Sequence, residues 1–157
     1  MWIVKIGGSW INNPNLSNLI KNLQRLSNKD NIIIVNGGGF FSDSVRLVYE
    51  NKRMSEKTGN YIALKATELF SHLLKEIDKN ICLVDDIESL RFSNKMLKIW
   101  LPSMILKNDS TFIKNWESTS DSVAAWLHSK INSLGLLYVK SLNFEKKKYK
   151  LKYLQDN

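Results

Sequence analysis

Two glycine clusters directly follow two short apolar segments. Residues 7–9 read Gly-Gly-Ser after the apolar segment 2–6, and residues 36–39 read Asn-Gly-Gly-Gly after the apolar segment 31–35. Glycines let the backbone approach a ligand closely and turn its amides toward an anion. Neither cluster has the GxxxxGK(S/T) or GxGxxG spacing of the common nucleotide loops. Each cluster alone is explained by a tight turn, but two at successive strand ends favour a binding site.

Two charged residues are candidates for chemistry at such a site. Lys5 lies inside the first apolar segment, two residues before Gly7. It either extends its ammonium group to solvent at the strand end or holds it over the glycine loop, where it would neutralise a transferring phosphate. Asp121 follows Thr119 and Ser120 at the start of a predicted helix, where an acid also suits the helix dipole.

Apolar segments of strand length alternate with segments of helical periodicity. We expect strands at 2–6, 31–35, 81–84, 96–101 and 136–139. We expect helices at 15–27, 40–49, 61–77 and 121–132, with a polar turn at 55–59. The apolar face of the 61–77 helix is expected on Ile62, Leu64, Leu69, Leu73, Leu74 and Ile77. Continuous apolarity in the strands indicates burial on both sheet faces. The sequence therefore predicts an α/β class protein, a three-layer αβα sandwich with a mostly parallel sheet, as one domain over 1–157.

Composition excludes several classes of protein. Of the 157 residues, 43% are hydrophobic and 24% charged, which is enough to bury a core and unlike a disordered chain. No apolar run approaches the length of a membrane span, and residues 1–9 do not have the form of a signal peptide. The single cysteine, Cys82, lies in an apolar run and is expected to be a buried thiol. These features favour a cytoplasmic protein.

The net charge of +8 is unevenly distributed. Residues 145–152 carry five lysines against one acid. A basic chain favours anionic ligands in general, but no nucleic-acid-binding motif accompanies this run. We interpret the tail, about 143–157, as a solvated terminal segment rather than a nucleic-acid patch, and keep nucleic-acid binding as the hypothesis that rests on charge alone.

Three segments in order, 5–9, 35–39 and 116–125, resemble the amino acid kinase family, which includes aspartate, acetylglutamate, glutamate and uridylate kinases. The resemblance implies a kinase that uses ATP and Mg²⁺. It implies a phosphate site at Lys5, Gly7, Gly8 and Ser9, with Lys5 stabilising the transferred charge. It implies acceptor contacts at Asn36, Gly37, Gly38 and Gly39, and a carboxylate, Asp121, that orients the catalytic lysines beside Thr119 and Ser120. Position 36 is commonly histidine in the family.

Within the family, the tryptophans and the Thr-Ser-Asp-Ser run of residues 100–102 and 116–127 are similar to a small branch. That branch phosphorylates an aminomethylfuran phosphate in methanofuran biosynthesis. The similarity implies a small-molecule acceptor in a one-carbon cofactor pathway, and membership of the family implies an oligomer.

The sequence also departs from the family pattern. Family members usually continue further, with a second catalytic lysine, and residues 140–143 replace an acidic segment. Lys140 either substitutes for that lysine or is a polar strand terminus. The chain is accordingly a kinase, a subunit completed by a partner, or a noncatalytic binding or regulatory protein of the same fold. No metal site is predicted, because His72 and His128 have no partner at ligand spacing and residues 85–86 are expected to cap a turn.

Overall fold

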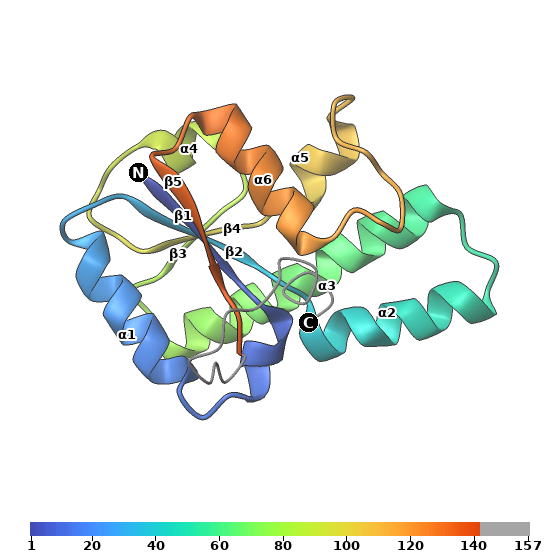
Figure 1. The fold of residues 1–157 in the computed structure, drawn as a ribbon, viewed down its shortest axis with the longest axis horizontal. Helices are drawn as coiled ribbons and strands as arrows, with labels where there is room; N and C mark the ends of the chain where they lie inside the picture. The colour runs from blue at the N-terminus through green and yellow to red at the C-terminus, as the bar shows by residue number, and fades with distance from the viewer. Residues whose placement is uncertain (142–157) are drawn as a thin grey trace, which may run out of the picture.

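A computed structural model describes residues 1–141, so the basic tail predicted at 143–157 lies outside the described residues. The described residues form one five-stranded sheet flanked by helices (Figure 1). The strands are β1 (Trp2–Ile6), β2 (Ile32–Asn36), β3 (Cys82–Val84), β4 (Lys98–Trp100) and β5 (Gly135–Val139). Their order is β3-β4-β2-β1-β5, and every pairing is parallel. The predicted α/β class with a parallel sheet is confirmed.

Helices cover both faces of this sheet, as predicted for three layers. They are η1 (Gly8–Asn12, a 3₁₀ helix), α1 (Leu16–Ser27), α2 (Gly39–Asn51), α3 (Glu56–Ile77), α4 (Ile87–Arg91), α5 (Ser103–Asn108) and α6 (Ser120–Ile131). One buried cluster joins the sheet to α1 and α3, and a second joins it to α4, α5, α6 and Leu64 of α3. In Figure 1, α1 and α3 lie on the opposite side of the sheet from α6.

The alternation of side chains along β1 determines where Lys5 lies. Ile3 belongs to the cluster beneath α6, whereas Val4 and Ile6 belong to the cluster beneath α1 and α3. Successive side chains of a strand point to opposite faces, so Lys5 shares the face of Ile3. Lys5 is 4% exposed and lies on the side of the sheet that carries α6.

The predicted turn at 55–59 is wrong. Ser55 caps α3, with its hydroxyl accepting a hydrogen bond from the Thr58 amide at 3.3 Å, and the helix begins at Glu56. The polar residues that indicated a turn form the exposed first turn of the helix. Serine three residues before a polar side chain is a helix-start pattern, which gives the physical reason for the difference.

The apolar face predicted for α3 is also only partly right. Leu64 and Leu74 are buried, but Leu69 is 52% exposed and Leu73 and Ile77 are each 38% exposed. The buried stripe includes Phe70 and the polar residues Thr67, Glu68 and Ser71. Glu68 is buried because it accepts hydrogen bonds from the Ser103 amide and the Lys65 ammonium group, both at 2.9 Å. Periodicity misses a buried face whose polar members have internal partners.

Smaller differences concern short elements. The strand expected at 96–101 forms only over Lys98–Trp100, which is β4. The short helices α4, α5 and η1 were not predicted. Lys98 in β4 is 1% exposed and donates hydrogen bonds to the carbonyls of Ser89 at 2.8 Å and Leu90 at 3.3 Å near the end of α4.

Cys82 is partly exposed rather than buried. Asp86 accepts from the Ser89 amide at 2.7 Å and so caps α4, which confirms the capping expected at 85–86.

None of the helices within residues 1–141 combines the length and apolarity needed to cross a membrane.

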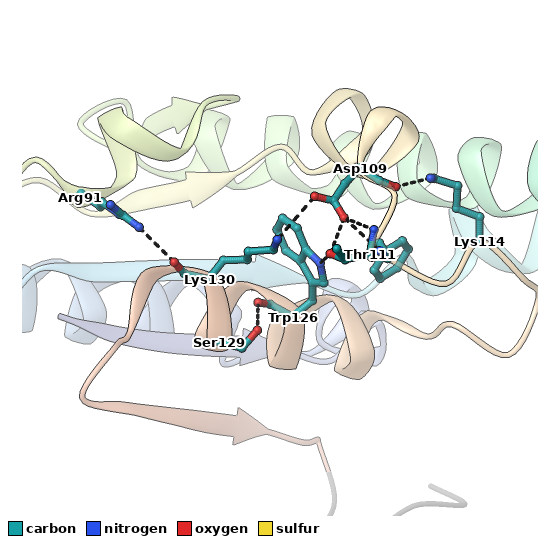
Figure 2. A network of polar contacts seen from close by, with 8 residues as sticks. Arg91, Asp109, Thr111, Lys114, Trp126, Ser129 and Lys130 are labelled. Atoms are coloured by element: carbon teal, nitrogen blue, oxygen red, sulfur yellow. Dashed lines mark hydrogen bonds and ion pairs between the residues drawn. The ribbon is translucent and has the colours of Figure 1, made fainter.

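A polar network fixes the segment that leads into α6 (Figure 2). Asp109 Oδ1 accepts hydrogen bonds from the Thr111 amide at 2.7 Å, the Thr111 hydroxyl at 2.5 Å and the Phe112 amide at 3.0 Å. Its Oδ2 lies 3.6 Å from Lys130 Nζ on α6, and Trp126 Nε1 donates to the Thr111 hydroxyl at 3.2 Å. The segment 109–119 is therefore tied to the helix whose first turn carries Asp121.

Candidate functional site

The two glycine clusters meet at the carboxyl edge of the sheet. β1 and β2 are neighbours, with Ile6 paired to Asn36, so their following turns lie side by side. A Cβ built on Gly37 would lie 2.6 Å from the Gly8 nitrogen, and one on Gly8 would overlap the backbone of Gly39. Gly39 also has a φ of +50°, which favours glycine. Close approach of the two turns therefore requires glycine at these positions.

Two helices start at these turns and at the facing loop. α2 begins at Gly39, directly after the second cluster, and α6 begins at Ser120. Neither has a side-chain hydrogen bond at its N-cap residue, Gly38 or Thr119. The first amides of a helix have no partner within it and carry partial positive charge. This arrangement suits a multiply charged anion such as a polyphosphate.

A carboxylate joins two lysines from different strands. Lys5 Nζ of β1 lies 2.7 Å from Asp121 Oδ1 of α6, and Lys140 Nζ, directly after β5, lies 3.3 Å from Asp121 Oδ2. β5 pairs with β1, which brings Lys140 to the same edge of the sheet as Lys5. The sequence left open whether Lys140 reaches the site, and the structure places it there.

Burial and charge act together on these three groups. Burial lowers the pKa of Lys5, and the positive charge of Lys140 also acts to lower it. The hydrogen bond and the charge of Asp121 act in the opposite direction, and the net result is a lowered pKa. Burial acts to raise the pKa of Asp121, but Lys5 and then Lys140 outweigh it, so its pKa is below the usual 3.8. Asp121 is consequently ionised at neutral pH and is a poor proton acceptor.

These residues border a cavity of about 560 Å³. The predicted site residues that line it are Lys5, Gly7, Gly8, Ser9, Asn36, Gly37, Gly38, Gly39, Thr119, Ser120 and Lys140. Asp121 is the predicted residue that does not line it and instead contacts the two lysines. The structure thus brings together residues that are up to 135 positions apart in the sequence, Lys5 and Lys140 being the extremes.

Two charged residues of the cavity, both on α2, were not predicted from the sequence. Asp43 and Arg46 both line it. They lie four and seven residues after Gly39, and these spacings place them on the same face of the helix as its first residue. That face opens onto the site because α2 begins at the glycine turn. Helical spacing from the glycine cluster was the signal that could have identified both residues.

Aromatic stacking forms another part of the wall. Trp116 lines the cavity and stacks on Tyr49 of α2, with ring centroids 4.2 Å apart and planes at 5°. Gly59 of α3 lies against both rings, and a Cβ there would lie 2.6 Å from Tyr49 and 3.2 Å from Trp116. The segment 109–119, α2 and α3 are therefore packed together beside the cavity.

Asn36 lines this cavity and has a buried side chain. It is 4% exposed, and its amide nitrogen donates to the Ser71 hydroxyl at 2.9 Å, while Ser71 donates to the Thr67 carbonyl at 3.3 Å. Its Oδ1 is buried without a partner among the described residues. A buried acceptor without a donor costs about 1–3 kcal/mol.

The residues present fit a nucleotide polyphosphate better than a protein-held metal. The touching glycine turns, two helix starts and two lysines suit phosphate oxygens. Among residues 1–141, no three histidine, cysteine or acidic side chains cluster as metal ligands. Mg²⁺ commonly keeps several waters and binds through substrate phosphates, so it would be held here mainly by a nucleotide.

Known proteins resemble the chain in sequence and in structure. No protein-family model matches it. The (5-(aminomethyl)furan-3-yl)methyl phosphate kinase of Methanocaldococcus jannaschii is 32% identical over 130 residues, which cover 81% of this chain and 59% of that kinase. The chain thus spans about three fifths of the length of the curated relative. Uridylate kinase from Archaeoglobus fulgidus superposes with a TM-score of 0.69 at 18% identity, covering 96% of this chain and 69% of that one.

UMP kinase from Ureaplasma parvum superposes with a TM-score of 0.62 at 16% identity, covering 88% of this chain and 65% of that one. The fold and the paired glycine turns therefore define an α/β protein with the architecture of uridylate kinases. With the sequence similarity to the Methanocaldococcus kinase, this places the protein more narrowly: the chain belongs to the amino acid kinase family.

Proposed function

We propose that the chain is a kinase that transfers the γ-phosphoryl group of ATP to the phosphate group of a small acceptor. The observation that carries the proposal is the contact of Lys5 and Lys140 with the single carboxylate of Asp121 beside two touching glycine turns. Phosphoryl transfer needs alignment and positive charge on the nonbridging oxygens more than covalent help. Two lysines and two helix starts are suited to that task.

No histidine lies among the described lining residues, whose one carboxylate is Asp43 on α2, and this favours a phosphate acceptor that needs no general base. An alcohol must lose a proton as it attacks phosphorus, whereas a phosphate monoester is largely ionised at pH 7. The described lining contains no histidine, and Asp121 is held by two lysines with a lowered pKa. An oxygen of the acceptor phosphate would attack the γ-phosphorus, the bond from that phosphorus to the β-bridging oxygen would break, and ADP would leave with the bond electrons.

Each residue has a defined role in this proposal. Lys5 and the amides of the glycine turns bind the transferred group, and Lys140 adds positive charge beside it. Asp121 is a positioning residue that holds both ammonium groups. A bound Mg²⁺, held by the phosphates, supplies additional charge neutralisation.

The aminomethylfuran phosphate is the first acceptor to test. The relative with 32% identity is named as a kinase of that compound, and its acceptor is itself a phosphate ester. The cavity contains a cation for such a phosphate, Arg46, and a carboxylate for an amine, Asp43. Placement in a methanofuran-like cofactor pathway, in the cytoplasm and as an oligomer, rests on this relationship.

The test is phosphoryl transfer followed by ³¹P NMR with MgATP and the aminomethylfuran phosphate. The proposal predicts ADP and a new diphosphate ester in equal amounts, and their loss in Lys5→Ala. Lys21→Gln on the exposed face of α1 removes a charge of the same sign away from the cavity and should keep the activity. If the wild-type chain bound ATP but transferred phosphate to no phosphate ester, the noncatalytic alternative would replace this proposal.

A further inference from the structure

A second cavity, separate in its lining from the glycine turns, is rich in lysine. It has a volume of about 440 Å³ and lies between the start of α3, the end of α5 and the segment 109–119. Lys57, Lys107 and Lys114 line it, one from each of these three elements. Among the described residues, no acidic side chain lines it. We call this cavity the lysine pocket.

The three ammonium groups are not neutralised within the described part of the chain. Neither Lys57, Lys107 nor Lys114 forms an ion pair among residues 1–141. Lys107 Nζ lies 4.5 Å from the centre of the Tyr61 ring, and Lys114 donates to the carbonyl of Asp109. The positive end of the 22-residue helix α3 adds to the field, because Lys57 lies in its first turn. Three lysines that line one cavity and form no ion pair among the described residues favour an anionic ligand.

The lysine pocket adjoins the cavity at the glycine turns. Asn60 and Leu64 line both. The Asn60 amide donates to the carbonyl of Asn115 at 3.0 Å, in the segment that carries Lys114 and Trp116. A ligand on Lys114 would therefore contact the same segment that forms the wall of the first cavity and enters α6 at Thr119.

We propose that the lysine pocket binds a phosphate-bearing anion, which contacts the segment 109–119 beside the catalytic cavity. The chemistry required is a compact group with two or more negative charges that three ammonium groups reach from different sides. Such a group is either the distal end of a phosphorylated substrate that spans Asn60 or a separate phosphorylated compound. This inference does not depend on phosphoryl transfer by the chain.

The test is titration of the full 157-residue chain with inorganic pyrophosphate, followed by backbone amide NMR shifts. We expect shifts at Thr58, Tyr61 and Lys114, in addition to any at Gly8 and Gly39. In the double variant Lys57→Gln, Lys107→Gln, the dissociation constant that the first set of shifts reports should rise about tenfold or more, as for loss of charge-assisted hydrogen bonds. The second set of shifts should stay as in the wild type. Both lysines are exposed, so this variant is expected to fold.

The matched control is Lys21→Gln, Lys29→Gln, which removes the same charge from the exposed residues of α1 and its end. The proposal is overturned if the first set of shifts is absent in the wild type, or if the double variant and the control behave alike. Repeating the titration with the aminomethylfuran phosphate separates the two sources. Shifts in both cavities at one equivalent assign the anion to the substrate, and shifts at Gly8 and Gly39 alone assign it to a separate compound. Failure of phosphoryl transfer would leave these shifts unchanged.

Discussion

At the residue level, Asp121 has two lysine partners, one near each of its carboxylate oxygens. Its Oδ1 contacts Lys5 at 2.7 Å and its Oδ2 contacts Lys140 at 3.3 Å. Two ammonium groups in one partly buried place would repel each other without a carboxylate between them. Asp121 is therefore a positioning residue, and kinetics can separate this role from a purely structural one.

Asp121→Asn should lower kcat by about 100-fold, the cost typical of misplaced catalytic groups, while the chain stays folded. The hydrogen bond and charge of Asp121 raise the pKa of Lys5 against burial. Removal of that charge should therefore lower the pKa of Lys5 further. The alkaline limb of the kcat profile, already expected below the usual lysine value of 10.5, should move to lower pH in the variant. A profile with an unchanged alkaline limb would contradict the positioning role.

The charged residues of α2 make a second prediction at this scale. If Asp43 binds the amine of an aminomethylfuran phosphate, Asp43→Asn should raise KM for that acceptor about tenfold, the value of a charge-assisted hydrogen bond. KM for ATP should be unchanged. A matched acceptor that lacks the amine should show no difference between wild type and variant. Equal effects on both acceptors would contradict this role of Asp43.

At the scale of elements, the two glycine turns depend on backbone contact between Gly8 and the 37–39 cluster. Gly8→Ala should cost about 1–3 kcal/mol in unfolding free energy, as overpacking does, and weaken MgATP binding. Gly7→Ala is the matched control, because a Cβ there would lie 3.5 Å from the Val139 carbonyl, an ordinary contact, with extended backbone. Thermal unfolding and calorimetry of both variants provide the measurement. Equal behaviour of the two variants would show that the close approach is unimportant.

The strands and helices could be predicted from the sequence more accurately than the faces that the helices bury. The buried strands and the glycines after them were visible because continuous apolarity and glycine are local signals. The buried face of α3 was misjudged, since Glu68 and Ser71 are buried through partners distant in sequence. The ion pairs of Asp121 were anticipated only through the family resemblance, because no local pattern connects residues 5, 121 and 140.

At the scale of the whole molecule, the segment 109–119 links the sheet to the site. Asp109 anchors it through three hydrogen bonds to Oδ1 and an ion pair with Lys130 (Figure 2). The same segment bears Lys114 and Trp116, which line the two cavities. Its anchoring should therefore affect both global stability and ligand binding.

Asp109→Ala should lower the free energy of unfolding by about 0.5–1.5 kcal/mol at pH 7, because the exposed Thr111 donors and the part-buried Phe112 amide lose their acceptor. The hydrogen bond of Thr111 and then the neighbouring amides and Lys130 hold the pKa of Asp109 below its usual 3.8. A lowered folded pKa contributes stability that is present above pH 3.8 and is lost as pH falls through the folded pKa. The difference in unfolding free energy between wild type and Asp109→Ala should therefore become smaller as the pH falls below 3.8. Asp30→Ala, at an exposed residue without a side-chain partner among the described residues, is the control.

Calorimetric titration with MgATP shows whether the glycine turns form a polyphosphate site with Lys5 as its cation. Wild-type chain and Lys5→Ala are compared under the same conditions, with circular dichroism to confirm that both are folded. We expect one-to-one binding to the wild type and a dissociation constant raised at least about tenfold in the variant, as for loss of a charge-assisted contact. Equal affinity in the two chains, or no binding to the wild type, would contradict it.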